Sequence, residues 1–142
     1  YRRLVPESDA PTNVHWAVDN RTVSLRVPSS DASNTRVENR VPGADANPYL
    51  VAATILAGIR KGLAEAIDPG PETTGNGYDD EASVTIPRDW ASAIAAARES
   101  DFLKDALGPE MHRTFTEVKA AEYQRVARTI SDVDYDLYLH TV

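Results

Sequence analysis

The sequence has no cysteine, and this absence excludes several classes of protein. Without thiols there is no disulfide framework, no thiolate zinc site and no cysteine nucleophile, and a reducing compartment is favoured. Long hydrophobic runs are also missing, since the longest apolar stretch, residues 49–67, is interrupted by Arg60 and Lys61. We therefore expect a cytoplasmic protein without a membrane partner.

Positive charge is scarce and unevenly placed in a chain whose net charge is −7. Residues 1–60 hold seven Arg and six acidic residues, a balance of 7 − 6 = +1. Residues 61–142 hold eight basic and sixteen acidic residues, a balance of 8 − 16 = −8. Nucleic-acid binding needs a broad basic face, so no nucleic-acid partner is expected. A local group of Arg residues instead indicates a site for a compact anion, such as phosphate or carboxylate.

The length and composition bound the number of domains. The 142 residues, 42% of them hydrophobic, are enough to bury one core. The chain starts without an initiator Met, inside the segment from Tyr1 to Pro6. We expect one domain or a piece of one.

The first third has the composition of short strands, predicted at about residues 13–18, 20–27 and 35–41. Asp19-Asn20 indicates a turn between the first two strands. The polar residues 29–34 are predicted to form the loop between the second and third strands, and its length allows these two strands to pair antiparallel.

The remaining two thirds are predicted to be mainly helical. Asn47 followed by Pro48 marks a helix start, because Asn caps free amides and Pro is tolerated at the first helical position. Asp68-Pro69-Gly70 is the expected end, and apolar residues recur every four positions between these signals: Val51, Ile55, Ile59, Leu63 and Ile67. A surface excursion is expected over 68–86, and further helices at about 89–98, 101–107, 109–129 and 132–139. The pattern predicts an α+β fold, with short antiparallel strands (about 13–41) followed by a helical shell (about 48–139).

A charged motif lies in the third predicted strand. The period of two places Arg36, Glu38 and Arg40 on one face, with neighbours about 7 Å apart. Such a group suits a site where the carboxylate holds a hard divalent cation and the guanidiniums grip oxyanions around it. The alternative is a salt-bridge ladder on a solvated sheet surface. The second strand adds Arg21 and Arg26, but these fall on opposite faces of a regular strand, so a shared site needs a bulge or a position at the strand ends.

Three stretches in this order resemble signature motifs of the glutamine synthetase family. They are Tyr1 to Pro6, Asn20 to Pro28, and Arg36 to Val41 continuing through Asp45 to Leu50. Their spacing is nearly that of the family, and the later helices resemble its carboxyl end. The resemblance implies that residues 1–142 are the C-terminal portion of a glutamine synthetase-like catalytic domain.

The resemblance also implies roles for individual residues. Family residues matching Arg21, Arg26 and Arg36 contact nucleotide phosphates, and the residue matching Glu38 binds the metal that accompanies ATP, Mg²⁺ or Mn²⁺. Family residues matching Arg3 and Arg40 bind the carboxylate groups of glutamate and of the phosphorylated intermediate. The implied reaction is γ-phosphoryl transfer from ATP to glutamate, followed by attack of an amine on the acyl phosphate.

The segment from Val5 to Pro11 corresponds to the family's flap over the amine site. Asp9 stands where glutamine synthetases ordinarily have Glu, and an acid there would bind a cationic amine and accept its proton. Glu7 is a competing candidate, and a turn-forming role for Asp9 is the plain alternative. The loop 29–35 is about one residue shorter than in ammonia-using enzymes. With the stretch from Val41 to Tyr49, these differences favour the glutamate-polyamine ligase branch, typified by γ-glutamylputrescine synthetase.

The resemblance also implies an assembly for the full-length protein and leaves two alternative functions open. The full-length protein is expected to be a homo-oligomer of stacked rings, a dodecamer, that serves nitrogen metabolism. The chain alone is expected to be inactive, because other metal ligands of the family lie upstream. Glutamine synthetase using ammonia is the first alternative, and a non-catalytic family member is the second.

Several residues are not promoted to the site. His15, His112 and His140 lack ligand spacing and are expected to be structural, and Trp16 and Trp90 are expected to pack. Tyr78 lies where some bacterial glutamine synthetases carry a regulatory tyrosine, but an exposed loop tyrosine is the preferred reading.

Overall fold

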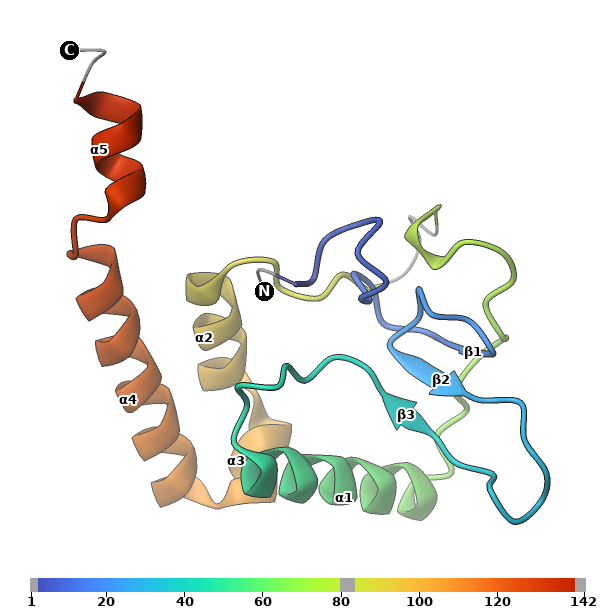
Figure 1. Cartoon of the computed structure of the whole chain (residues 1–142). Coiled ribbons are helices and arrows are strands. Elements are labelled where there is room, and N and C mark those ends of the chain that lie inside the picture. The colour runs from blue at the N-terminus through green and yellow to red at the C-terminus, as the bar shows by residue number, and fades with distance from the viewer. Residues whose placement is uncertain (1–2, 80–83, 140–142) are drawn as a thin grey trace. The chain divides into compact units, whose positions relative to one another are not determined.

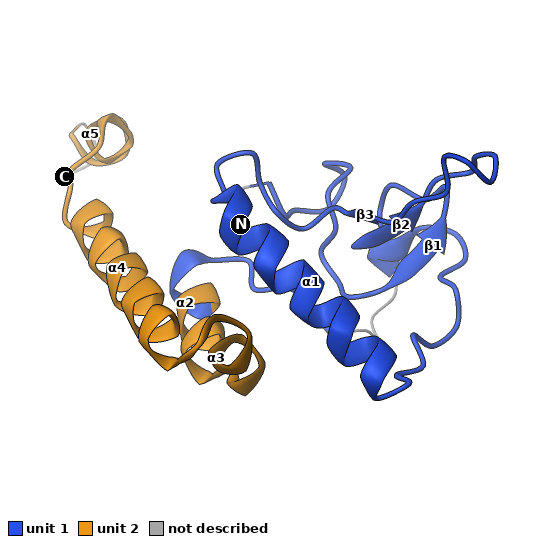
Figure 2. Cartoon of the chain, turned by 90° about the horizontal axis from the view of Figure 1, so that it is seen from below, with its two compact units in different colours: residues 1–92 blue, residues 93–142 orange. Residues whose placement is uncertain are grey.

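The computed structural model describes residues 3–79 and 84–139 of the chain. The chain divides into two compact units, residues 1–92 and 93–142, which are coloured separately in Figure 2. The first unit contains a three-stranded sheet and a long helix, and the second is helical. The predicted α+β class is therefore confirmed. His140 lies outside the described residues.

The sheet of the first unit is small and mixed. Its strands are β1 (Trp16–Val18), β2 (Leu25–Val27) and β3 (Glu38–Asn39), with β2 in the middle (Figure 1). β2 and β3 pair antiparallel, as the polar loop between them predicted. β3 covers only part of the expected strand because β2 is itself only three residues long and pairs with it through Leu25 and Arg26.

The expected antiparallel pairing of the first two strands is wrong, because β1 and β2 run parallel. Parallel strands usually need a long crossover. Here each strand has three residues, and the six residues from Asp19 to Ser24 suffice to bring the chain back about 10 Å. Asn20 organises this return, since its Oδ1 accepts hydrogen bonds from Thr22 N and Thr22 Oγ1 at 2.9 and 2.7 Å.

The long helix α1 (Pro48–Ala64) begins where the sequence indicated. Asn47 Oδ1 accepts hydrogen bonds from the amides of Tyr49 and Leu50, at 3.0 and 3.2 Å. The helix ends before the expected Asp68-Pro69-Gly70 stop, because Ala66 takes a left-handed conformation (φ 48°). Ile67 N then donates to Gly62 O at 3.0 Å, the bond of a Schellman cap.

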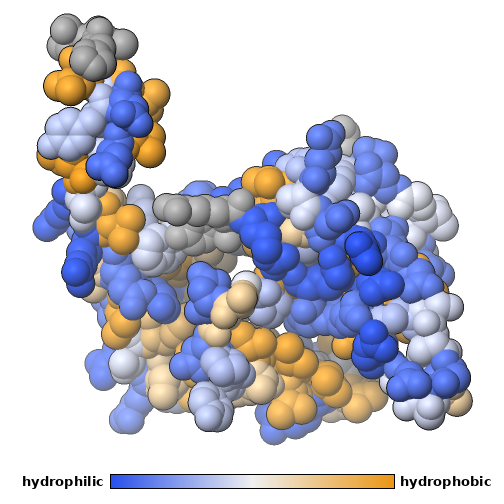
Figure 3. Space-filling view, in the orientation of Figure 1, coloured by the Kyte–Doolittle hydropathy of each residue, from blue (hydrophilic) through white to orange (hydrophobic). Residues whose placement is uncertain are grey.

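Much of the predicted apolar face of α1 stays exposed in this chain. None of the helix residues is buried, and Leu56, Ile59 and Leu63 are exposed. Figure 3 shows apolar side chains gathered over this helix. The amphipathic pattern thus predicted the helix correctly, but the described residues do not cover its apolar face.

The second unit consists of helices joined by short turns. They are α2 (Trp90–Glu99), whose first residues belong to the first unit, α3 (Asp101–Leu107), α4 (Pro109–Ala127) and α5 (Asp132–Tyr138). α3 occupies the predicted range, and α4 ends two residues early, at Ala127. No helix in residues 3–79 and 84–139 is both long and apolar enough to span a membrane.

The buried core lies in the first unit and includes residues of the amino-terminal segment. Leu4, Ala10 and Ile86 form this core, with Val41 packed on it. Leu4 and Ala10 therefore fix both ends of a segment whose middle, Val5 to Asp9, is exposed.

Candidate active site around Glu38

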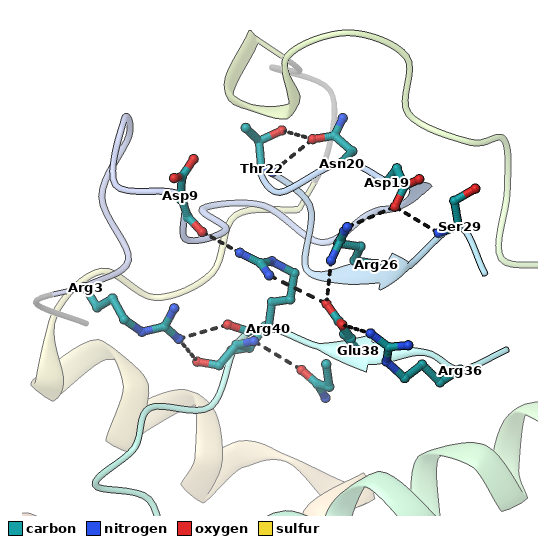
Figure 4. A network of polar contacts seen from close by, with 12 residues as sticks. Arg3, Asp9, Asp19, Asn20, Thr22, Arg26, Ser29, Arg36, Glu38 and Arg40 are labelled. Atoms are coloured by element: carbon teal, nitrogen blue, oxygen red, sulfur yellow. Dashed lines mark hydrogen bonds and ion pairs between the residues drawn. The ribbon is translucent and has the colours of Figure 1, made fainter. Parts of the chain in front are cut away.

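Glu38 is the centre of a cluster of guanidinium groups. Its Oε2 lies 3.1 Å from Arg26 Nη1 and 3.8 Å from Arg40 Nη1, and its Oε1 lies 3.0 Å from Arg36 Nη2 (Figure 4). The predicted gathering of Arg36, Glu38 and Arg40 is present in the structure. Arg36 reaches Glu38 from just outside β3, so a regular strand over the whole motif is not required.

Arg26 enters the cluster from the neighbouring strand. The antiparallel register pairs Arg26 directly with Glu38, which is why the side chains meet. Arg26 also binds Asp19, with Nη2 2.9 Å from Asp19 Oδ1. Asp19 was expected only as a turn residue, and sequence reasoning missed its role in orienting this guanidinium.

The cluster carries a surplus of positive charge. The guanidiniums of Arg26, Arg36 and Arg40 face the carboxylates of Glu38 and Asp19, a balance of 3 − 2 = +1. Such a surplus, presented by planar forks on one face, is suited to oxyanions.

Both carboxylates of the cluster are held in the ionised form. The hydrogen bond from Arg26, and after it that from Arg36, holds the pKa of Glu38 below its ordinary value, although partial burial raises it. The backbone hydrogen bond from Ser29 and the charge of Arg26 likewise lower the pKa of Asp19. Glu38 is therefore available as an anionic ligand at neutral pH.

Two members of the cluster are more buried than a solvated ladder would require. The side chains of Arg26 and Arg40 are 19% and 20% exposed, whereas that of Arg36 is 54% exposed. The Nε atoms of Arg26 and Arg40 are buried without a hydrogen-bond partner in the part of the chain that the structure describes. Because unpaired buried donors are destabilising, this arrangement favours a functional site over a salt-bridge ladder.

Arg40 and Arg3 tie the amino-terminal segment to the cluster. Arg40 Nη2 donates to the carbonyl oxygen of Asp9 at 2.7 Å. Arg3 Nη2 donates to the carbonyls of Arg40, Val41 and Pro42 at 2.9, 2.9 and 3.2 Å. Arg40 thus binds the backbone of the amino-terminal segment, and Arg3 binds the backbone around Arg40.

Two predicted site residues lie outside this network. Arg21 is exposed in the return between β1 and β2, and among the described residues it makes no ion pair. The carbonyl of Asp9 faces Arg40, but its carboxylate points away from Arg40 in Figure 4. Glu7 is also exposed. Because β2 begins only at Leu25, Arg21 does not lie on this strand, and the expectation about opposite strand faces does not apply to it.

The residues that the sequence analysis set aside have packing or tethering roles. His15 Nε2 lies 3.0 Å from the Gly77 carbonyl oxygen, and His112 Nε2 lies 2.7 Å from that of Ala97. Trp16 Nε1 donates to Gly70 O at 3.0 Å. The expectation of an exposed Tyr78 is wrong, because its ring is half-buried and its hydroxyl donates to Ala10 O at 3.0 Å.

Comparisons with known proteins identify the family of the chain. The family model described as the glutamine synthetase catalytic domain matches residues 1–138. Gamma-glutamylputrescine synthetase PuuA of Escherichia coli (strain K12) is 39% identical over 139 residues, which are 98% of this chain and 29% of that protein. A glutamine synthetase of Methanococcus voltae is 34% identical over 146 residues, 98% of this chain and 33% of that protein.

A solved structure of a GmaS/ADP complex, in its conformation 1, also resembles the chain. The TM-score is 0.79 at 26% sequence identity, over 95% of this chain and 31% of that one. The chain spans about a third of the length of these relatives. Because the family model matches nearly the whole sequence, the chain belongs to the glutamine synthetase catalytic-domain family.

Proposed function

We propose that the chain is the C-terminal part of the catalytic domain of an ATP-dependent ligase that joins the γ-carboxylate of glutamate to an amine. The observation that carries this proposal is the convergence of three guanidiniums on Glu38 in a chain of this family. Phosphoryl transfer depends on positioning and on neutralising charge, which such a cluster supplies.

The proposed reaction has two steps. A γ-carboxylate oxygen of glutamate attacks the γ-phosphorus of ATP, the bond from that phosphorus to the bridging oxygen breaks, and ADP leaves with γ-glutamyl phosphate formed. The amine nitrogen then attacks the acyl carbon, the carbon–oxygen bond to phosphate breaks, and inorganic phosphate leaves. The amine's surplus proton passes to an acidic side chain, for which we assign Asp9, with Glu7 as the competing candidate.

The cluster suggests a division of labour among the Arg residues. Arg36 has the most exposed guanidinium of the three around Glu38, which suits contact with nucleotide phosphates. We assign phosphate contacts to Arg26 and Arg21 as well, and carboxylate binding to Arg3 and Arg40. The assignment of Arg21 rests on the family motif, since the structure keeps it apart from Glu38.

A divalent cation, Mg²⁺ or Mn²⁺, would supply charge neutralisation for ATP, and Glu38 is the side chain we assign to it. The donor chemistry fits, because an ionised carboxylate is the ligand that hard cations prefer. The described residues contain no group of three candidate metal ligands. The remaining oxygen ligands must therefore come from phosphates or from other parts of the full-length protein.

The amine is proposed to be putrescine or another polyamine or alkylamine. Support comes from the identity of 39% to gamma-glutamylputrescine synthetase PuuA against 34% to the M. voltae glutamine synthetase. The shorter acid at position 9 is also expected to change the size of the amine pocket. The test is an ADP-release assay on the full-length protein with glutamate, ATP and a panel of amines that includes putrescine and ammonium.

Glutamine synthetase activity is the second candidate, because the relatives also include several proteins of that name. ADP release with ammonium and with no other amine would establish it and overturn the polyamine assignment. The absence of ADP release with every amine, from a folded full-length protein, would overturn both.

The full-length protein is further proposed to be a cytoplasmic homo-oligomer of stacked rings, a dodecamer. Sedimentation of the full-length protein tests this, and a stable monomer would contradict it. The isolated chain is proposed to be inactive, because it contributes Glu38 but no complete set of metal ligands among its described residues. Turnover by the isolated 142 residues would contradict that.

A further inference from the structure

The segment from Val5 to Ala10 has a backbone that needs external support. Glu7 and Asp9 have φ angles of 63° and 54°, in the left-handed region that is unfavourable for side chains other than glycine. Part of the support is internal, since Ser8 Oγ donates to the carbonyls of Arg3 and Val5. The rest must come from outside the segment.

Two donors from distant parts of the first unit provide this support. Arg40 Nη2 donates to the carbonyl of Asp9 at 2.7 Å, and the Tyr78 hydroxyl donates to the carbonyl of Ala10 at 3.0 Å. These are consecutive carbonyls, so the two hydrogen bonds hold the two peptide units that follow Asp9. Arg40 belongs to the Glu38 cluster, whereas Tyr78 is 68 residues away from Ala10 in the sequence.

Tyr78 lies in the short helix η1 (Gly77–Asp79), which hydrogen bonds anchor to the first unit. Gly77 N donates to Thr22 Oγ1 at 2.8 Å, and Gly77 O lies 3.0 Å from His15 Nε2. A Cβ at Gly77 would stand 2.8 Å from Thr22 Oγ1, so only glycine permits this close approach. Asn76 Oδ1 also accepts from Tyr78 N at 3.1 Å. The phenol is thus presented to Ala10 from a fixed position.

We infer that Tyr78 is a positioning residue for Asp9: by holding the Ala10 carbonyl, it sets the direction of the Asp9 carboxylate toward the amine. This inference rests on the proposed function, in which Asp9 binds the amine and accepts its proton. It adds a residue outside the motifs to the determinants of amine recognition. A merely structural Tyr78 would stabilise the fold without a selective effect on the amine.

The test is steady-state kinetics of the full-length protein carrying Tyr78→Phe, which removes only the hydroxyl. We expect the KM for the amine to rise roughly three- to tenfold, the size of one neutral hydrogen bond, with the KM for ATP and for glutamate unchanged within twofold. Tyr138→Phe is the matched control, because Tyr138 is 61% exposed and lies outside the family motifs, and we expect it to change no constant. Equal rises in all three KM values, or no rise in the amine KM, would overturn the inference.

A double-mutant cycle with Asp9→Asn separates positioning from general stability. If Tyr78 acts through Asp9, the effect of Tyr78→Phe on the amine KM disappears in the Asp9→Asn background. If the effects of the two substitutions multiply instead, Tyr78 does not act through Asp9. A wild-type protein that releases no ADP with any amine refutes the proposed function, and the inference falls with it. An active wild type whose amine KM ignores Tyr78→Phe refutes the inference alone.

Discussion

The two units of the chain are stabilised by polar interactions of different range. In the first unit, side chains of Trp16 and Asn20 bond to backbone carbonyls 54 and 55 residues further along the chain. In the second unit, the hydroxyl of Thr116 bonds to a carbonyl four residues away, and Lys119 pairs with Glu122. The first unit therefore depends on distant partners, and the second largely on local helical ones.

The same contrast applies to charge. Glu38 and Glu117 each form a close ion pair with Arg, at 3.1 Å to Arg26 and 2.9 Å to Arg98. Glu38 is 28% exposed and shared by three guanidiniums, whereas Glu117 is 66% exposed and paired with one. The two ion pairs therefore differ in energy despite their similar distances, because an exposed ion pair contributes little to stability. The comparison teaches that the number of partners and the burial, rather than the distance alone, distinguish the two charges.

The sharpest way to break this comparison is Glu38→Gln in the full-length protein. We expect kcat/KM for ATP to fall about 100-fold or more, because the proposed metal ligand loses its charge and the Arg residues lose their counter-charge. The measurement is ADP release at saturating glutamate and amine, with thermal unfolding recorded alongside to separate activity from folding.

Glu117→Gln is the matched control for that experiment. It removes an ion pair of similar length in the second unit, and we expect kcat/KM within twofold of wild type and a stability change within about 0.5 kcal/mol. Similar losses for the two variants would show that the distinction between the clusters is wrong.

The next effect concerns the packing of Gly77 and tests the dependence of the first unit on distant contacts. Gly77→Ala places a Cβ 2.8 Å from Thr22 Oγ1 and 3.0 Å from His15 Cε1. We expect a loss of about 1–3 kcal/mol in the free energy of unfolding, because these neighbours must shift. The measurement is denaturant unfolding of the full-length protein.

Gly62→Ala in α1 is the control, since a Cβ there meets nothing within 4 Å. Alanine is the better helix former, so we expect no loss and a gain of up to about 1 kcal/mol. If Gly77→Ala were as harmless as Gly62→Ala, the close approach of η1 to Thr22 would not be a structural requirement.

Local signals made the helices and part of the site predictable. Asn47-Pro48 identifies a helix start by chemistry confined to four residues, and the structure shows the cap. The gathering of Arg36 and Arg40 around Glu38 is likewise local, because each is two residues from Glu38, although β3 itself covers only Glu38 and Asn39. In contrast, the end of α1 was missed, because Ala66 adopts the left-handed conformation without the glycine that usually signals it.

Partners from distant segments were beyond the reach of such signals. The meeting of Arg26 with Glu38 depends on the register between two strands, and the bond from Tyr78 to Ala10 joins residues 68 positions apart. The parallel pairing of β1 and β2 was missed because the Asp19-Asn20 pair is typical of a tight turn. In this chain it begins a longer return, in which Asp19 is an anchor for Arg26.

The smallest expected effect is a pH dependence that distinguishes Glu38 from other carboxylates. Hydrogen bonds from Arg26 and Arg36 hold the pKa of Glu38 below its ordinary value, and Arg40 also faces it. A lowered folded-state pKa means that its contribution to stability is fully present above the ordinary pKa and is lost as the pH falls through the lowered one. Glu38→Gln removes that titration.

The gap in melting temperature between wild type and Glu38→Gln should therefore be largest at neutral pH and should shrink below about pH 4. Asp19, whose pKa is also lowered, titrates in both proteins and leaves the difference unaffected to first order. The measurement is thermal unfolding of both full-length proteins across this range. If the gap in melting temperature widened on acidification, the folded protein would be more stable with Glu38 protonated. The guanidiniums would then not be holding Glu38 as an anion.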